Sequence, residues 1–179
     1  MKAIAAIVAF IAWGSVLTCL ARAAESETGL RAQKPLVVIS GADSHVMKPA
    51  FERYASPDDW TRAWAKHLGT TVEDHYRAVL DVDFDRCLVV AIFQGAKVNA
   101  RGIRIESIRE GAESIYIRFE ELGYQSVVGP NSKPKPPERP YAFIVLPKSS
   151  KRIVIEENVQ SIKNAPPKWQ ERARLVAAH

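Results

Sequence analysis

A histidine with carboxylates close to it in the sequence is the first group in this chain that could do chemistry. Glu73 and Asp74 precede His75, and Asp81 and Asp83 follow it within a few residues. A histidine oriented by a carboxylate can move protons near neutral pH as a general acid or base. A small secreted hydrolase with such a dispersed site is therefore the alternative to a non-catalytic function.

Other catalytic and metal-binding patterns are missing from the sequence. Asp81, Asp83 and Asp85 begin like a calcium loop, but Arg86 and Ile92 stand where such a loop needs glycine and glutamate. The histidines lack metal-ligand spacing, and there is no nucleophile elbow, zinc helix or phosphate-binding glycine loop. We therefore expect no catalytic residue, no metal and no cofactor.

Cysteine chemistry is not expected either. The chain has 2 cysteines, and Cys19 leaves with the N-terminal segment if that segment is cleaved, so no internal disulfide is expected in the mature domain. Cys87 opens an apolar run that ends at Phe93, where a thiol packs as a small hydrophobic side chain.

The first 23 residues are typical of a secretion signal. Lys2 gives a positive start, an apolar run ends at Leu20, and Ala21-Arg22-Ala23 offers small residues at a cleavage position. We expect cleavage after this tripeptide and a periplasmic or secreted protein. An uncleaved membrane anchor and a lipid anchor at Cys19 are the alternatives.

The charge of the chain argues against nucleic-acid binding. The 25 Lys and Arg residues exceed the 20 Asp and Glu residues by a formal net charge of +5, and the basic residues are interleaved with acidic ones. Nucleic-acid binding needs a concentrated positive patch. We expect no nucleic-acid partner, and membrane contact only if the signal is uncleaved.

One helix is indicated clearly. Ser56 can cap it, Pro57 suits its first turn, Trp60 and Trp64 recur at helical spacing, and Gly69 supplies a stop. A short C-terminal helix is also expected, because three apolar residues after Pro167 recur at helical spacing; they are Trp169, Ala173 and Val176.

Strands are expected before and after the first helix. Residues 102–106 and 114–120 alternate apolar and polar side chains and predict an antiparallel hairpin, with charged residues on its solvent face. The predicted fold class is α+β, with an antiparallel sheet of about five or six strands packed against one main helix. The other expected extended segments are 35–39, 47–54, 87–93, 141–146 and 152–156, and the four charged residues are Arg104, Glu106, Arg118 and Glu120.

These segments resemble the C-terminal domain of the PrcB-like protease-complex subunits of bacteria. The likeness covers roughly residues 48–157 and rests on the tryptophan helix, Val82-Asp83-Phe84, Leu88–Phe93 with Gly95, the Ile103/Ile105 strand and Pro140–Lys148. It implies an exported, non-catalytic accessory domain that binds or stabilises another envelope or secreted protein, which in that family belongs to a protease complex. The expected parts of the chain are a signal (1–23), a polar linker (24–34), the PrcB-like domain (35–157) and a C-terminal extension (158–179).

Two loops are the predicted binding sites of such an accessory domain. Where the family has a Gly-Gly-aromatic turn, this chain has Asn99-Ala100-Arg101-Gly102. The second loop, around Lys133 to Tyr141, is rich in proline, and its stiffness lowers the entropy cost of docking. Arg101 offers planar donors to a carboxylate, and Tyr141 offers an aromatic face. The predicted binding residues are Asn99, Arg101, Gly102, Lys133, Lys135 and Tyr141.

Overall fold

A computed structural model describes residues 29–71, 80–125, 135–160, 162 and 165–177. The chain divides into two compact units, residues 1–30 and 31–179, and the second contains all the elements that follow. In chain order these are β1 (Arg31–Ala32), β2 (Val37–Gly41), β3 (Pro49–Tyr54), α1 (Pro57–Leu68), β4 (Cys87–Gln94), β5 (Ala100–Glu110), β6 (Ser114–Gly123), β7 (Tyr141–Pro147), β8 (Arg152–Asn158) and β9 (Trp169–Leu175).

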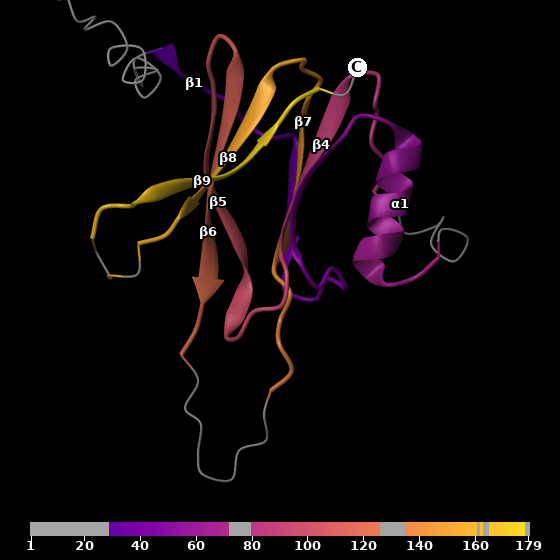
Figure 1. Cartoon of the computed structure of the whole chain (residues 1–179). Helices are drawn as coiled ribbons and strands as arrows, with labels where there is room; N and C mark the ends of the chain where they lie inside the picture. Colours follow the sequence, from indigo (N-terminus) through magenta and orange to yellow (C-terminus); the bar gives the residue numbers. More distant parts are fainter. Residues whose placement is uncertain (1–28, 72–79, 126–134, 161, 163–164, 178–179) are drawn as a thin grey trace, which may run out of the picture. The chain divides into compact units, whose positions relative to one another are not determined.

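The strands form two sheets. One has the order β1-β5-β6-β8-β9 and the other the order β2-β7-β4-β3. After β6 the chain passes through β7 in the four-stranded sheet and returns as β8, which pairs with β6 in parallel. The other described strand pairs are antiparallel. Figure 1 shows the five-stranded sheet on one side of β4 and β7 and α1 on the other.

The central strands β4 and β7 are buried on both faces. Leu88, Val90 and Ile92 of β4 pack into the core between the two sheets, whereas Val89 and Phe93 pack into the core on the side of α1. A strand covered on both faces reads as a continuous apolar run instead of an alternating one. This double burial explains the apolar segments 87–93 and 141–146, and both are confirmed as strands.

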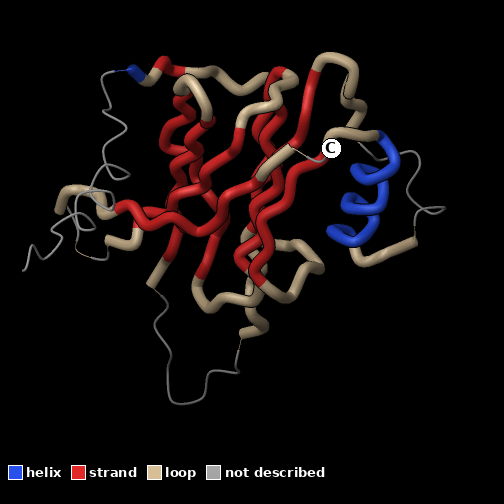
Figure 2. The backbone as a smooth tube through the Cα atoms, turned by 45° about the horizontal axis from the view of Figure 1, so that its top comes forward, coloured by secondary structure: helices blue, strands red, loops and turns tan. Residues whose placement is uncertain are grey.

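The predicted helix is confirmed at α1. The Ser56 hydroxyl accepts a hydrogen bond from the Asp59 amide (3.3 Å), and Gly69 ends the helix with a positive φ of 73°. Trp60 is 2% exposed, its Nε1 donates to the Leu80 carbonyl at 2.9 Å, and its ring meets Phe143 of β7 edge-on at 5.0 Å. Figure 2 shows this helix beside the strands.

The predicted α+β class and antiparallel pairing hold in coarse form, but the expected single sheet is wrong. The period-two segments β5 and β6 form the expected hairpin. However, they pair in one sheet while β4 and β7 pair in the other. The period of the apolar residues shows which faces of a strand are buried, but it does not show which strands pair with it. Two strands that follow each other along the chain can therefore belong to different sheets.

The expected C-terminal helix is also wrong, because residues 169–175 form strand β9. β9 pairs antiparallel with β8, with an irregularity between Ile155 and Glu156. Ala173 and Leu175, two residues apart on one face of β9, both pack against the core between the sheets. The sequence fits a helical and an alternating pattern equally, and the available edge of β8 selects the strand by supplying main-chain hydrogen bonds.

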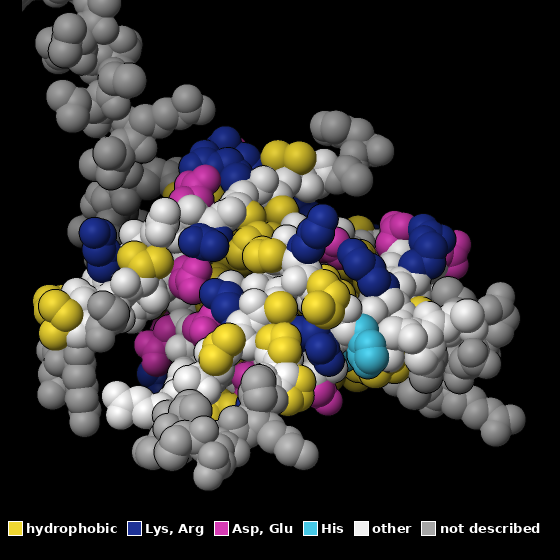
Figure 3. Space-filling view, turned by 60° about the horizontal axis from the view of Figure 1, so that its bottom comes forward, with side chains coloured by type: hydrophobic (Ala, Val, Ile, Leu, Met, Phe, Trp, Pro, Cys, Tyr) yellow, Lys and Arg dark blue, Asp and Glu magenta, His cyan; other side chains and the backbone are white. Residues whose placement is uncertain are grey.

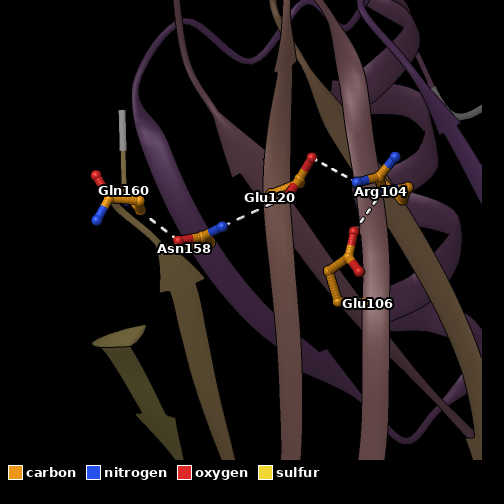
Figure 4. A network of polar contacts seen from close by, with 5 residues as sticks. All are labelled: Arg104, Glu106, Glu120, Asn158 and Gln160. Atoms are coloured by element: carbon orange, nitrogen blue, oxygen red, sulfur yellow. Dashed lines mark hydrogen bonds and ion pairs between the residues drawn. The ribbon is translucent and has the colours of Figure 1, made fainter. Parts of the chain in front are cut away.

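The charged outer face of the hairpin forms a polar network (Figure 4). Arg104 donates to Glu106 and, at 2.7 Å, to Glu120, which also accepts a bond from Asn158 at 3.5 Å. Arg118 pairs with Glu156 at 2.7 Å. Cross-strand pairs of opposite charge stabilise a solvated sheet face, which is the role expected for these residues from the sequence.

Within the described ranges, no helix combines the length and the apolar character that crossing a membrane requires. The described Cys87 is a free thiol, partly buried against the core on the side of α1.

Candidate interaction surface

Three loops meet at one end of the strands. The Lys97 amide donates to the Glu138 carbonyl at 2.7 Å, and the Arg139 amide donates to the Ala42 carbonyl at 2.7 Å. Figure 1 shows the β4–β5 connection and the chain leaving β6 at this same end. The backbone of the proline-rich loop therefore ties its two neighbours together. We call this region the loop surface, and its described residues are 42–48, 95–101, 124–125 and 135–140.

The backbone of the β4–β5 connection depends on residues with positive φ. Gly95 has φ of 69°, and a Cβ placed on it would lie 2.8 Å from the Met47 carbonyl oxygen. Asn99 has φ of 59°, a conformation that asparagine tolerates better than most residues. Gly102 has φ of 146° and lies against Gly41 of β2. These three residues hold the connection close to the other loops.

Two of the predicted binding residues lie against one aromatic ring. The Arg101 guanidinium carbon is 5.0 Å from the centre of the Tyr124 ring, and the Lys135 Nζ is 4.8 Å from it. Both distances allow cation–π attraction. The Tyr124 hydroxyl donates to Glu138 at 2.5 Å, and Lys135 Nζ donates to the same carboxylate at 2.5 Å. The loops thus present two cations beside a positioned tyrosine.

The charges in this cluster persist over a wide pH range. Hydrogen bonds from Lys135 and Tyr124 lower the pKa of the Glu138 carboxyl to about 2. The bonds to Glu138 and Tyr124 raise the pKa of the Lys135 ammonium. The Glu138 carboxylate and the Lys135 ammonium therefore both stay charged throughout the physiological range.

Exposed apolar side chains accompany these charges. Val98 is 78% exposed and Met47 is 57% exposed, and Lys48 and His45 are exposed beside them. Figure 3, which brings this end of the strands forward, shows apolar side chains interleaved with Lys and Arg side chains. Exposed apolar side chains together with arginine and tyrosine are the composition favoured at protein–protein contacts.

The structure separates the predicted binding residues into three groups. Asn99, Arg101 and Lys135 belong to the loop surface, with the side chains of Arg101 and Lys135 exposed. Gly102 is buried and Tyr141 is 9% exposed, so neither offers much surface to a partner. Lys133 lies outside the described residues. Sequence reasoning missed Tyr124, because no local pattern links the end of β6 to Lys135.

Tyr141 instead contacts a buried histidine. The ring of His67 is 4.2 Å from that of Tyr141 and meets Phe143 edge-on at 5.0 Å. His67 is 4% exposed, and its Nδ1 atom has no hydrogen-bond partner among the described residues. Burial lowers the pKa of His67, opposed by the charge of Asp43 and reinforced by that of His45. His67 follows Trp64 by three residues and Trp60 by seven, so helical spacing places it on the same face of α1 as the buried Trp60. This spacing is the signal by which the sequence could have identified it as a core residue.

We expect the stability of the domain to fall as the pH drops from about 7.5 to about 5, because burial lowers the pKa of His67 in the folded domain. An unfolded histidine titrates near pH 6.5. Below that value the unfolded chain binds a proton that the folded chain resists, so acid favours unfolding. Melting temperatures of the wild type and of His67→Gln across this range test the prediction. A pH dependence that is the same in both proteins would contradict it.

The carboxylates and the histidine named for the hydrolase alternative do not come together in the part of the chain that the structure describes. Glu73, Asp74 and His75 lie outside the described residues. Asp81 and Asp83 are exposed, and Asp83 Oδ1 accepts the amide of Asp85 at 3.1 Å while its carbonyl accepts that of Cys87 at 2.8 Å. Asp83 thus shapes the turn before β4. Among the described residues, no group of three or more His, Cys, Asp and Glu could hold a metal ion.

Comparison of the chain with protein-family models, with curated proteins and with solved structures finds no match in any of the three.

Proposed function

We propose that this chain is an exported, non-catalytic accessory domain that binds another envelope or secreted protein through the loop surface. The observation that carries the proposal is the cluster around Tyr124, where Arg101 and Lys135 lie within 5.0 Å of one ring. The predicted secretion signal supports the exported compartment. The resemblance to PrcB-like subunits supports the class of function. The resemblance does not by itself imply that this partner is a protease.

The chemistry of the loop surface favours an acidic partner surface with an apolar centre. Arg101 can donate two parallel hydrogen bonds to one carboxylate. Val98 is 78% exposed and can fill an apolar pocket on the partner. Because Lys97 already pairs with Glu121 at 3.0 Å and Lys135 with Glu138, Arg101 is the cation of this group that we expect to contribute most to binding.

Crosslinking of the tagged mature protein in cell envelopes, followed by capture, tests this function. We expect one and the same exported protein in every replicate. Failure to find a reproducible exported partner would contradict the proposal. So would hydrolysis of esters, peptides or glycans that His75→Ala abolishes, because such activity would establish the hydrolase alternative.

A further inference from the structure

A small pocket lies beside the connection between β7 and β8. Its volume is about 310 Å³, and Ser149 and Ser150 of this connection contribute to its lining. Arg53 of β3 and Lys148, which directly follows β7, are the charged residues among the described lining. The described lining of this pocket therefore combines two positive side chains and two hydroxyl groups with no carboxylate.

The guanidinium of Arg53 is held in place without an acidic partner. It donates to the Lys151 carbonyl at 3.0 Å and to the Ser149 carbonyl. Its Nε atom is buried and has no hydrogen-bond partner among the described residues. Burial lowers the pKa of Arg53, as expected for a cation that loses water without gaining a neighbouring carboxylate. The two carbonyl oxygens orient the guanidinium but do not neutralise its charge.

Lys148 is the second cation of the pocket. Its Nζ donates to the Phe84 carbonyl at 2.9 Å. In the part of the chain that the structure describes, no carboxylate forms a salt bridge with Lys148 or with Arg53. The nearby Lys151 differs, because it pairs with Glu110 at 2.7 Å. Both cations of the pocket are therefore available to an external anion.

The charge of the pocket favours a dianion. A dianion neutralises both cations, whereas a single carboxylate leaves one of them without a counter-charge. Guanidinium and ammonium groups both bind phosphate, the first through directed hydrogen bonds and the second as a point charge. Arg53 keeps further N–H donors for this purpose, because a guanidinium has more donors than its two carbonyl acceptors use.

The uncharged lining suits the rest of such a ligand. The Ser149 Oγ accepts the Lys151 amide at 3.2 Å, and a hydroxyl that accepts one hydrogen bond can still donate its own hydrogen to a phosphate oxygen. Ala55 and Ala177 add apolar surface to the lining. This apolar surface favours an ester with a small organic group over the free ion.

We propose that this pocket binds the phosphate group of a small phosphate monoester, whose two negative charges are neutralised by Arg53 and Lys148. Leu88, near the start of β4, lines the pocket, whereas residues 95–101 of the loop surface follow the end of that strand. The inference therefore goes beyond the proposed function and does not depend on the loop surface.

Titration of the ¹⁵N-labelled mature protein with phenyl phosphate, followed by NMR, tests the proposal. The titration is made at about pH 8, where the ester is a dianion because its second pKa is about 6. We expect saturable shifts of the amide signals of residues 148–151. Benzoate, which carries one negative charge, is expected to bind at least about tenfold more weakly. Inorganic phosphate is expected to bind at the same residues but more weakly than the ester.

Lys148→Met is expected to weaken the binding of phenyl phosphate about tenfold. Lys148 is exposed, so the variant is expected to fold, which its melting temperature verifies. Arg53→Gln is expected to weaken binding to a similar extent, because glutamine removes the charge but keeps an N–H donor for the carbonyls of the connection.

Lys168→Met is the matched control, because it removes an exposed ammonium just before β9, whereas Ala177 lies beyond the other end of that strand. It is expected to leave binding unchanged. Absence of saturable shifts, equal binding of benzoate, or equal binding by folded Lys148→Met and Lys168→Met would overturn the proposal. Inorganic phosphate that binds as tightly as phenyl phosphate, or more tightly, would overturn the assignment to an ester.

Discussion

Replacing Trp60 by alanine is expected to destabilise the folded domain by about 3–5 kcal/mol. The indole is 2% exposed and packs against Phe143 at 5.0 Å and Trp64 at 5.3 Å. Its removal opens a large cavity between α1 and β7 and leaves the Leu80 carbonyl without the indole donor. Chemical unfolding of the wild type and the variant gives the difference in free energy directly.

The control for Trp60→Ala is a truncation at an exposed apolar residue. Val176 is 66% exposed, and Val176→Ala is expected to change the free energy of unfolding by less than about 0.5 kcal/mol. Equal effects of the two substitutions would show that α1 does not depend on Trp60 for its attachment to the sheet.

Replacing Gly95 by alanine is expected to destabilise the domain by about 1–3 kcal/mol. Gly95 has φ of 69°, and the added Cβ would lie 2.8 Å from the Met47 carbonyl oxygen and 2.9 Å from the Lys48 carbonyl carbon. These are backbone atoms, so the β2–β3 loop must move to make room. The change strains the loop surface as well as the end of β4.

Gly123→Ala is the matched control, because a Cβ at Gly123 would find its nearest neighbour, the Asn99 oxygen, at 3.7 Å. We expect it to alter stability by less than about 0.5 kcal/mol. Thermal unfolding of both variants separates the cost of positive φ and crowding at Gly95 from the general cost of losing a glycine. Similar melting temperatures for the two variants would contradict the assignment.

Local patterns in the sequence predicted most of the elements. Ser56 and Gly69 marked the two ends of α1, and the alternation in β5 and β6 marked their hairpin. The layers could not be predicted, because the burial of β7 on both faces does not say which strands lie beside it. Residues 169–175 were mistaken for a helix because their own pattern does not show that the edge of β8, the preceding strand, is open for pairing.

The candidate site was predicted only in part for a similar reason. Arg101 and Lys135 were chosen from separate loops, one for its departure from a family pattern and one for its stiff prolines. Tyr124, the ring that both cations contact, directly follows the last residue of β6 and carries no local signal. His67 was not predicted as a site residue, and the structure buries it in the core. A histidine at the end of an amphipathic helix is commonly exposed.

The charge of Arg101 provides the most direct test of the central claim, that the loop surface binds another exported protein. Arg101→Glu reverses an exposed charge in the loop surface. Arg86→Glu reverses an exposed charge just before β4, and the loop surface lies at the opposite end of β4. In quantitative capture of the partner, we expect a loss of about tenfold for Arg101→Glu and wild-type capture for Arg86→Glu. Equal capture by the two folded variants, or a loss confined to Arg86→Glu, would contradict it.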